Sequence, residues 1–283
     1  MNSSMEKIFT TIDNRTTEIQ QEQGLSYLES LLVTTENWLD GIIQPEQANG
    51  KEDIRKAIQL AVLKGMKEHV QPHHQMTPDA LGLLVGYLVE LFVKDKQATV
   101  LDPAVGTGNL LFTVMNYLDG QITGAGVELD DLLIRLASNI GNLVEQPVTL
   151  YLQDALQPLL IDPVDAVVSD LPVGFYADEE NAATFELQAE EGMSYAHHLF
   201  IEQSLKHTKE GGFLFFIVPK ALFESPLAGQ LHDYLKKTAH IQAVMELPEN
   251  LFKNETHAKG ILVLQKRKEG VRPPREVLLA RVP

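Results

Sequence analysis

Hydrophobic and polar positions follow two different rhythms along this chain. From about Thr16 to Val70, apolar residues recur every three to four positions, which predicts amphipathic helices. Leu28 and Leu31 lie on one face of the first helical stretch. Proline, asparagine and glycine between positions 44 and 50 end this stretch, and another helix follows. The pattern therefore predicts a small N-terminal helical domain, residues 1–71.

Beyond Thr77 and Pro78, predicted strands alternate with helices. The predicted strands are residues 99–105, 123–129, 149–154, 166–171, 212–218, 241–247 and 260–265, and the predicted helices are residues 107–118, 131–143, 193–208 and 226–237. Strict alternation indicates a parallel sheet with helices on both faces. The last two strands have no helix between them, so we expect the last strand to run antiparallel. Residues 72–283 are therefore predicted to form a Rossmann-like, doubly wound α/β domain with a seven-stranded, mostly parallel sheet.

The N-terminal helices carry no motif that points to chemistry. They can simply pack against the α/β domain, or they can offer a surface for a partner or for self-association. The sequence leaves both roles open.

Composition narrows the class of protein. The chain has 283 residues, 44% of them hydrophobic, which is ordinary for a globular protein. No apolar run approaches the ~20 residues of a membrane span, and the first residues lack the pattern of a signal peptide. Cysteine is absent, which excludes disulfides and thiolate chemistry. We therefore expect a cytoplasmic protein that does not enter a membrane.

Charge is unevenly spread along the chain. The net charge is -16, and residues 137–205 contain no lysine or arginine. Residues 251–283 hold eight basic residues against three acidic ones. Nucleic acids are held mainly by basic residues that neutralise phosphates. If this protein acts on nucleic acid, the tail or a separate recognition protein must supply the positive surface.

The first predicted strand runs into a glycine-rich turn. The turn reads Leu101-Asp102-Pro103-Ala104-Val105-Gly106-Thr107-Gly108-Asn109-Leu110. Gly106 and Gly108 allow a ligand to approach the backbone closely at the start of a helix. Leu111 stands where a dinucleotide fingerprint would place a third glycine. Asp102 disfavours a pyrophosphate and suits a cofactor with a cationic amino-acid end, so charge favours S-adenosylmethionine (SAM) over NAD.

Acidic residues end the next two strands as well. Glu128 ends the second strand and is placed to accept hydrogens from both hydroxyls of a ribose. Asp154 ends the third strand and could accept a hydrogen from an adenine amine. Each of these acids could instead form a turn or cap a helix. Their succession at three strand ends favours a cofactor site.

Other kinds of catalytic site find little support. His73-His74 and His197-His198 are adjacent pairs, whereas two metal ligands on one helix face need a spacing of four. No metal site is therefore expected. His198 could face the pocket or pack in the core. Neither a Ser/His/Asp order nor a phosphate-binding loop is present in the sequence.

Together these motifs resemble the class I SAM-dependent methyltransferases. More specifically, they resemble the N6-adenine DNA methylases related to the modification subunit of type I restriction–modification systems. The resemblance covers about residues 72–268 and rests on Gln75-Met76-Thr77-Pro78, LDPAVGTGNLL, Gly126-Val127-Glu128-Leu129, Gln153-Asp154-Ala155, GGFLFFIVPKALF (211–223) and ELPENLFKNETHAKGILVLQK (246–266). It implies that Thr77 lies at the methionine end of SAM. It also implies that Glu128 with Leu129 contacts the ribose, and Asp154 with Ala155 the adenine.

The resemblance extends to the end of the fourth strand, where the family has Asn/Asp-Pro-Pro-aromatic. There the Asn/Asp side chain and the next backbone carbonyl accept both hydrogens of the target amine, which localises its lone pair towards the methyl group. The aligned residues here are Asp170, Leu171, Pro172 and Val173. Asp170 keeps the side-chain acceptor. Pro172 biases Leu171 to an extended backbone that can aim its carbonyl correctly.

The family aromatic, which stacks on a flipped base, is replaced here by Val173. Base–aromatic stacking is worth roughly 1–3 kcal/mol, so its loss could weaken binding by on the order of 5- to 150-fold. Phe175 or Tyr176 could replace it, because Gly174 lets the loop bend. Both could equally pack against the neighbouring helix.

Three functions are consistent with this pattern. The retained motifs match an N6-adenine-type methyltransferase that acts on nucleic acid with a recognition partner. The altered loop and an acidic run at residues 178–191 favour a protein amide or a small molecule as acceptor, although such runs are often only solvated loops. An intact cofactor motif beside an altered catalytic motif also fits a SAM-binding protein with reduced or lost catalysis that acts through partners.

Overall fold

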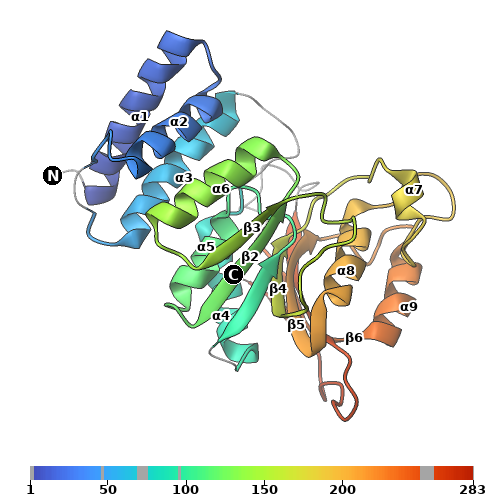
Figure 1. The fold of residues 1–283 in the computed structure, drawn as a ribbon. Helices are drawn as coiled ribbons and strands as arrows, with labels where there is room; N and C mark the ends of the chain where they lie inside the picture. Colours follow the sequence, from blue (N-terminus) through green and yellow to red (C-terminus); the bar gives the residue numbers. More distant parts are fainter. Residues whose placement is uncertain (1–2, 46–47, 69–75, 95–96, 249–257, 283) are drawn as a thin grey trace.

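A central eight-stranded sheet, covered by helices on both faces, forms the frame of the molecule (Figure 1). The computed structural model describes residues 3–45, 48–68, 76–94, 97–248 and 258–282. The strands are β1 (Ala98–Asp102), β2 (Ile122–Glu128), β3 (Val148–Leu152), β4 (Val164–Asp170), β5 (Thr208–Pro219), β6 (Ala239–Glu246), β7 (Lys259–Lys266) and β8 (Leu278–Arg281). Their order in the sheet is β3-β2-β1-β4-β5-β7-β6-β8.

Strand directions follow the predicted α/β pattern. β1 to β5 pair in parallel, and β7 lies between β5 and β6, antiparallel to both. The predicted antiparallel strand at residues 260–265 is therefore confirmed. Within the described residues the sheet has eight strands rather than seven, because the short and largely exposed β8 pairs with β6 in parallel. Four residues at a sheet edge carry too little hydrophobic alternation to be recognised as a strand.

Successive strand residues point to opposite faces of the sheet and fill two hydrophobic cores. On β5, Phe215 and Ile217 lie in one core, whereas Leu214 and Phe216 lie in the other. The helices of the first core are α4 (Asp79–Phe92), α5 (Asn109–Tyr117) and α6 (Asp131–Leu143), and those of the second are α7 (Glu179–Ala182), α8 (Ala196–Lys206) and α9 (Ala228–Thr238). Burial on both faces explains the nearly continuous apolar runs of these strands.

Three helices precede α4 in the described chain, and the second and third of them pack against α6 (Figure 1). They are α1 (Ser4–Gln23), α2 (Tyr27–Leu39) and α3 (Lys51–Glu68). Helical structure begins well before the predicted Thr16, because Ser3 and Glu6 form a capping box. A second capping box, between Ser26 and Glu29, starts α2. The three helices share the core of the first face, and the predicted domain boundary at 71/72 falls outside the described residues.

The helix α4 was not predicted from the sequence. Its residues, DALGLLVGYLVELF, are mostly apolar, and even its exposed positions include Leu83, Tyr87 and Leu91, so the sequence shows no polar face. Gly82 lets α4 lie close to α5, since an added Cβ would come within 2.8 Å of Thr113. Within the described ranges, neither α4 nor any other helix is long and apolar enough to cross a membrane.

Candidate active site

Four carboxylates lie close together at the carboxyl ends of the parallel strands. Asp102, Glu128 and Asp170 are the last residues of β1, β2 and β4, and Asp154 follows β3 closely. The chain winds outward from β1 through β2 to β3 and then returns to β4 on the other side of β1. Sheets of this kind bind ligands at such a reversal of strand order. The structure therefore brings the four predicted acids to one edge.

Asp102 is buried between β1, β4 and the glycine turn. It is 2% exposed, and its Oδ1 accepts hydrogen bonds from the Ala104 amide at 3.0 Å and from Ser169 Oγ at 2.8 Å. Burial raises the pKa of Asp102 to about 7, and the charges of Asp170 and Glu128 add to the rise. A cation beside this carboxyl group would stabilise its charged form, so the position favours a positively charged ligand.

The turn after β1 needs two of its glycines for different reasons. Gly106 and Gly108 have φ angles of 55° and 85°, in the left-handed region. A Cβ on Gly108 would lie 2.2 Å from the Phe112 ring. A Cβ on Gly106 would meet nothing within 4 Å, so this side of the turn is open. The backbone therefore permits close approach of a ligand at the start of α5.

Glu128 ties the glycine turn to the end of β2. Its Oε2 accepts a hydrogen bond from the Gly106 amide at 2.9 Å, and its Oε1 accepts from the amides of Leu129 at 2.9 Å and Asp130 at 3.0 Å. A carboxylate oxygen can accept two hydrogens, so Oε2 keeps room for a ligand hydroxyl. Leu129 is 69% exposed and offers apolar surface to a flat ligand ring.

Asp154 is hydrogen-bonded to the loop that follows β4. The Tyr176 hydroxyl donates to Asp154 Oδ2 at 2.6 Å and accepts from Asn181 Nδ2 at 3.0 Å. Asp154 Oδ1 accepts from the Leu156 amide at 2.9 Å. Burial and the bond to Asp154 raise the pKa of Tyr176 to about 12, so the hydroxyl stays protonated. The structure thus joins the predicted adenine acceptor to one of the two predicted aromatics.

Thr77 and Asn109 connect the site with the N-terminal helices. Thr77 Oγ1 donates to Asp170 Oδ2 at 3.0 Å, and its carbonyl accepts from Asn109 Nδ2 at 2.7 Å. Arg55 on α3 donates to Asn109 Oδ1 at 2.8 Å and pairs with Asp79 at 2.8 Å. The Asn109 side chain is therefore occupied within the protein, and its backbone amide stays the candidate cofactor contact. Sequence reasoning missed Arg55, because one arginine on a helix forms no motif.

Asp170 accepts hydrogen bonds on both carboxylate oxygens. Thr77 donates to Oδ2, and Lys259 Nζ lies 2.5 Å from Oδ1. Lys259 begins β7 and reaches the site because β7 runs antiparallel to β5 and pairs there with Pro219. Sequence analysis placed Lys259 in the distal family segment but assigned it no role. A single lysine before an apolar strand gives no signal of its own.

The loop after β4 separates its two aromatic residues. Leu171 is buried, and its amide donates to a β5 carbonyl at 3.1 Å, which fixes the start of the loop. Gly174 has a φ of 130°, which favours glycine. Phe175 is 57% exposed and stacks on Tyr195, with ring centroids 5.1 Å apart. Phe175 is therefore the exposed aromatic, whereas Tyr176 faces Asp154.

Acidic side chains cover the surface next to this loop. All six acids of the run are exposed: Asp178, Glu179, Glu180, Glu186, Glu190 and Glu191. Part of the basic tail lies elsewhere, because β7 leads away from the site. At its far end Lys266 Nζ donates to the carbonyl of Thr208, at the start of β5. Lys266, with Arg267 and Lys268 directly after it, therefore lies far from the candidate site, whereas Lys259 and Arg281 lie at the site's end of the strands.

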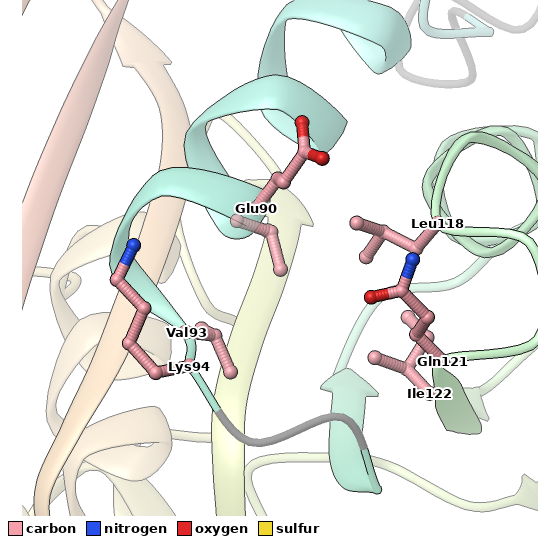
Figure 2. Close-up of a pocket in the computed structure, with 7 residues that line it drawn as sticks. Glu90, Val93, Lys94, Leu118, Gln121 and Ile122 are labelled. Atoms are coloured by element: carbon pink, nitrogen blue, oxygen red, sulfur yellow. The ribbon is translucent and has the colours of Figure 1, made fainter.

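A cavity of about 260 Å³ lies at the opposite end of the strands from the carboxylates (Figure 2). Glu90 and Lys94 line it from the end of α4, and Leu118, Gln121 and Ile122 line it from the segment that leads into β2. These residues precede β1 or lie at the start of β2, so the cavity is at the amino ends of the strands. It is separate from the carboxylate site.

The histidines do not assemble a metal site in the described part of the chain. His197 and His198 are buried on α8, and burial lowers the pKa of each to about 4. His198 is packed in the interior, as one of the two expectations had it. Among the described residues no group of three His, Cys, Asp or Glu side chains could hold a metal ion. His73-His74 lies outside the described residues.

Known proteins resemble this chain over most of its length. The family model described as N-6 DNA Methylase matches residues 74–280. The uncharacterized protein YtxK of Bacillus subtilis (strain 168) is 49% identical over 234 residues, which are 82% of this chain and 71% of YtxK.

Solved structures are similar as well. A Listeria monocytogenes protein, provisionally described as a class I SAM-dependent methyltransferase, is 44% identical, with a TM-score of 0.92 over 99% of this chain and 93% of that chain. The type I restriction-modification methyltransferase subunit from Streptococcus thermophilus is 19% identical, with a TM-score of 0.68 over 85% of this chain and 54% of that chain. At this lower identity the second comparison shows the shared fold alone.

Proposed function

Because this chain belongs to the N-6 DNA methylase family and has a class I methyltransferase fold, we propose that it transfers a methyl group from SAM to the exocyclic amine of adenine in nucleic acid. One observation carries the proposal. Asp170, an acceptor for amine hydrogens, adjoins the buried Asp102, to which the preceding Ser169 donates a hydrogen bond. A site for an amine and a site for a cation therefore lie side by side.

The strand-end residues fit the cofactor. SAM supplies an activated methyl group when it is bound. Asp102 would hold its cationic amino-acid end, with Thr77 nearby, and Glu128 would accept hydrogens from the ribose. Asp154 and the exposed Leu129 would hold the adenine ring. The residues that would line the pocket mainly through their backbone are Pro103, Ala104, Gly106, Gly108, Asn109, Leu110 and Ala155.

The amine is activated by two acceptors. Asp170 accepts one N–H bond of the target amine, and the Leu171 carbonyl accepts the other. Both hydrogen bonds draw the nitrogen lone pair away from the ring, which makes the amine a better nucleophile. Pro172 keeps Leu171 extended. Since Asp170 is a carboxylate, it can also take the proton that the methylated amine must lose.

Phe175 is the aromatic that stacks on the flipped base. Its ring is exposed on the loop and is backed by Tyr195, so it presents a supported flat surface. Tyr176 is a weaker candidate because its hydroxyl is bound to Asp154. Stacking of this kind is worth roughly 1–3 kcal/mol, which offsets the loss of an aromatic at Val173.

Nucleic acid would reach the site with the help of a separate recognition protein. The exposed acids at residues 178–191 repel a phosphate backbone near the loop. Lys266, Arg267 and Lys268 of the basic tail lie at the other end of β7. A partner would therefore supply both sequence recognition and positive surface.

A protein amide is the second candidate acceptor. The same acidic surface would attract a cationic polypeptide, whereas it repels nucleic acid. Asp170 and the Leu171 carbonyl could serve an amide nitrogen in the same way. This candidate differs from the first only in the acceptor, so one experiment separates them.

Labelled SAM identifies the acceptor class. The protein is incubated with labelled SAM and a lysate from cells that lack adenine methylation, and the products are digested with nuclease or protease. We expect the label to be lost to nuclease alone, and to be absent with Asp170→Ala although that variant still binds SAM in calorimetry. Loss to protease alone would support the amide acceptor. No label from a protein that binds SAM would indicate absent catalysis.

A further inference from the structure

Lys259 places a cation directly on the candidate catalytic carboxylate. Its Nζ lies 2.5 Å from Asp170 Oδ1, and the two side chains are 17% and 14% exposed. Thr77 takes the other oxygen of Asp170. Each carboxylate oxygen has a second lone pair, so the lysine does not fill the acceptor capacity of Asp170. The target amine and Lys259 can therefore bind Asp170 at the same time.

The ammonium group of Lys259 has N–H donors beyond the one that bonds Asp170. Lysine carries three N–H donors, and within the described ranges Asp170 is the acceptor to which Lys259 donates. Lys259 sits at the start of β7, at the same sheet edge as the carboxyl end of β5. Its remaining N–H bonds are therefore available to a ligand beside Asp170.

Asp170 and Lys259 together present an acceptor next to a donor. The exocyclic amine of adenine is a donor, and the ring nitrogens that flank it, N1 and N7, are acceptors. The two patterns are complementary. We infer that Lys259 is a specificity-determining residue that donates a hydrogen bond to the ring nitrogen next to the methylated amine, an inference that rests on the proposed function.

This assignment predicts a specific kinetic effect. A hydrogen bond from a cation to a ring nitrogen draws the lone pair of the amine towards the ring and does not activate the amine, so this hydrogen bond contributes to acceptor binding. Its loss should raise KM for the acceptor about tenfold or more, as expected for a hydrogen bond from a charged group, in addition to any change in kcat that follows from the lost ion pair with Asp170. A residue that merely positioned Asp170 would lower kcat instead.

The test couples a variant to an altered base. Wild type, Lys259→Met and Lys259→Arg are compared on a DNA duplex that the wild type methylates, with any required recognition protein supplied from a lysate. The target base is adenine, 1-deazaadenine or 7-deazaadenine. Lys268→Met, an exposed lysine beyond the far end of β7, is the matched control. Affinity for SAM is measured in parallel by calorimetry.

We expect Lys259→Met to raise KM on adenine, and one of the two deaza bases to raise KM by a similar factor for the wild type. On that base Lys259→Met should cause no further loss, and Lys259→Arg should recover part of the effect on adenine. The inference is overturned if the rises in KM caused by Lys259→Met and by the altered base multiply on both deaza bases. It is also overturned if Lys259→Met leaves KM unchanged, lowers kcat alone, or weakens SAM binding by the same factor.

The failure of the inference can be told apart from failure of the proposed function. A wild type that methylates DNA without this coupling contradicts the role of Lys259 alone. A wild type that methylates only protein contradicts the nucleic-acid acceptor, and the role of Lys259 with it.

Discussion

Arg55 on α3 donates a hydrogen bond to Asn109 on α5 at 2.8 Å, which joins the N-terminal helices to the glycine turn. Arg55 is 2% exposed and also pairs with Asp79 at 2.8 Å. Asn109 in turn donates to the Thr77 carbonyl, and the Thr77 hydroxyl donates to Asp170. The helical region is thus connected to the candidate catalytic carboxylate through three side chains.

Arg55→Met should destabilise the protein strongly. The change leaves the buried Asn109 Oδ1 without its donor and the Asp79 side chain, which is 27% exposed, without its cation, so the cost should be about 1–3 kcal/mol. Arg135→Met is the matched control, since Arg135 pairs with Glu36 at the surface and should cost no more than about 1 kcal/mol. Urea unfolding measures both, and equal losses would contradict the structural role of Arg55.

SAM binding should release a proton from Asp102. The pKa of Asp102 is about 7 in the folded protein, above its ordinary value, so the folded state prefers the protonated form. A bound cation reverses this preference, because it stabilises the carboxylate. At pH 6 binding should therefore release close to one proton from Asp102, and above pH 8 almost none.

Calorimetry in two buffers of different ionisation enthalpy measures this release. Asp102→Asn, which cannot titrate, should bind SAM more weakly and lose the release at pH 6. If the variant releases as many protons as the wild type, Asp102 does not face the cationic end of the cofactor.

Gly108→Ala should lower the free energy of unfolding by more than the backbone strain alone would. The left-handed φ costs about 1–2 kcal/mol for alanine, and the overlap with Phe112 adds about 1–3 kcal/mol. Gly120→Ala is the control, because Gly120 has a φ of 74° but open space around it. Thermal unfolding should show the larger loss for Gly108→Ala. Equal losses would mean that the turn relaxes around the extra methyl group.

Phe175→Ala should weaken acceptor binding. Loss of a stacking ring costs about 1–3 kcal/mol, which is a rise of about 5- to 150-fold in KM for DNA. Tyr176→Phe keeps the ring and removes only the hydroxyl that bonds Asp154, so it should act on SAM affinity instead. Steady-state kinetics with each substrate separates the two effects. If Tyr176→Phe raised KM for DNA and Phe175→Ala did not, Tyr176 would be the stacking residue.

Much of the sheet could be predicted from the sequence, because its strands are buried apolar runs bounded by turns. The helix α6 has the predicted bounds. The acids of the candidate site were also predictable, since parallel strands end on the same side of a sheet. Asp102, Glu128 and Asp170 end their strands as predicted, whereas Asp154 lies two residues beyond the end of β3. Local patterns carried this information, and no contact distant in sequence was needed.

Contacts between distant segments could not be predicted. Lys259 reaches Asp170 only because β7 runs antiparallel between β5 and β6, and Arg55 reaches Asn109 only because α3 packs near the glycine turn. Tyr176 and Phe175 are adjacent in sequence, yet only the folded loop shows that one bonds Asp154 and the other is exposed. Their different roles depend on the positions of β3 and of the segment before α8.

Methyl transfer by wild type and Asp170→Ala shows whether Asp170 activates the adenine amine. The measurement follows labelled methyl groups from SAM to DNA that lacks adenine methylation, with any required recognition protein supplied from a lysate, and checks SAM binding by both proteins. We expect transfer to adenine N6 by the wild type and at least a hundredfold loss in the variant, roughly the contribution of a catalytic acid or base, at nearly equal SAM affinity. Undiminished transfer by Asp170→Ala would contradict this role.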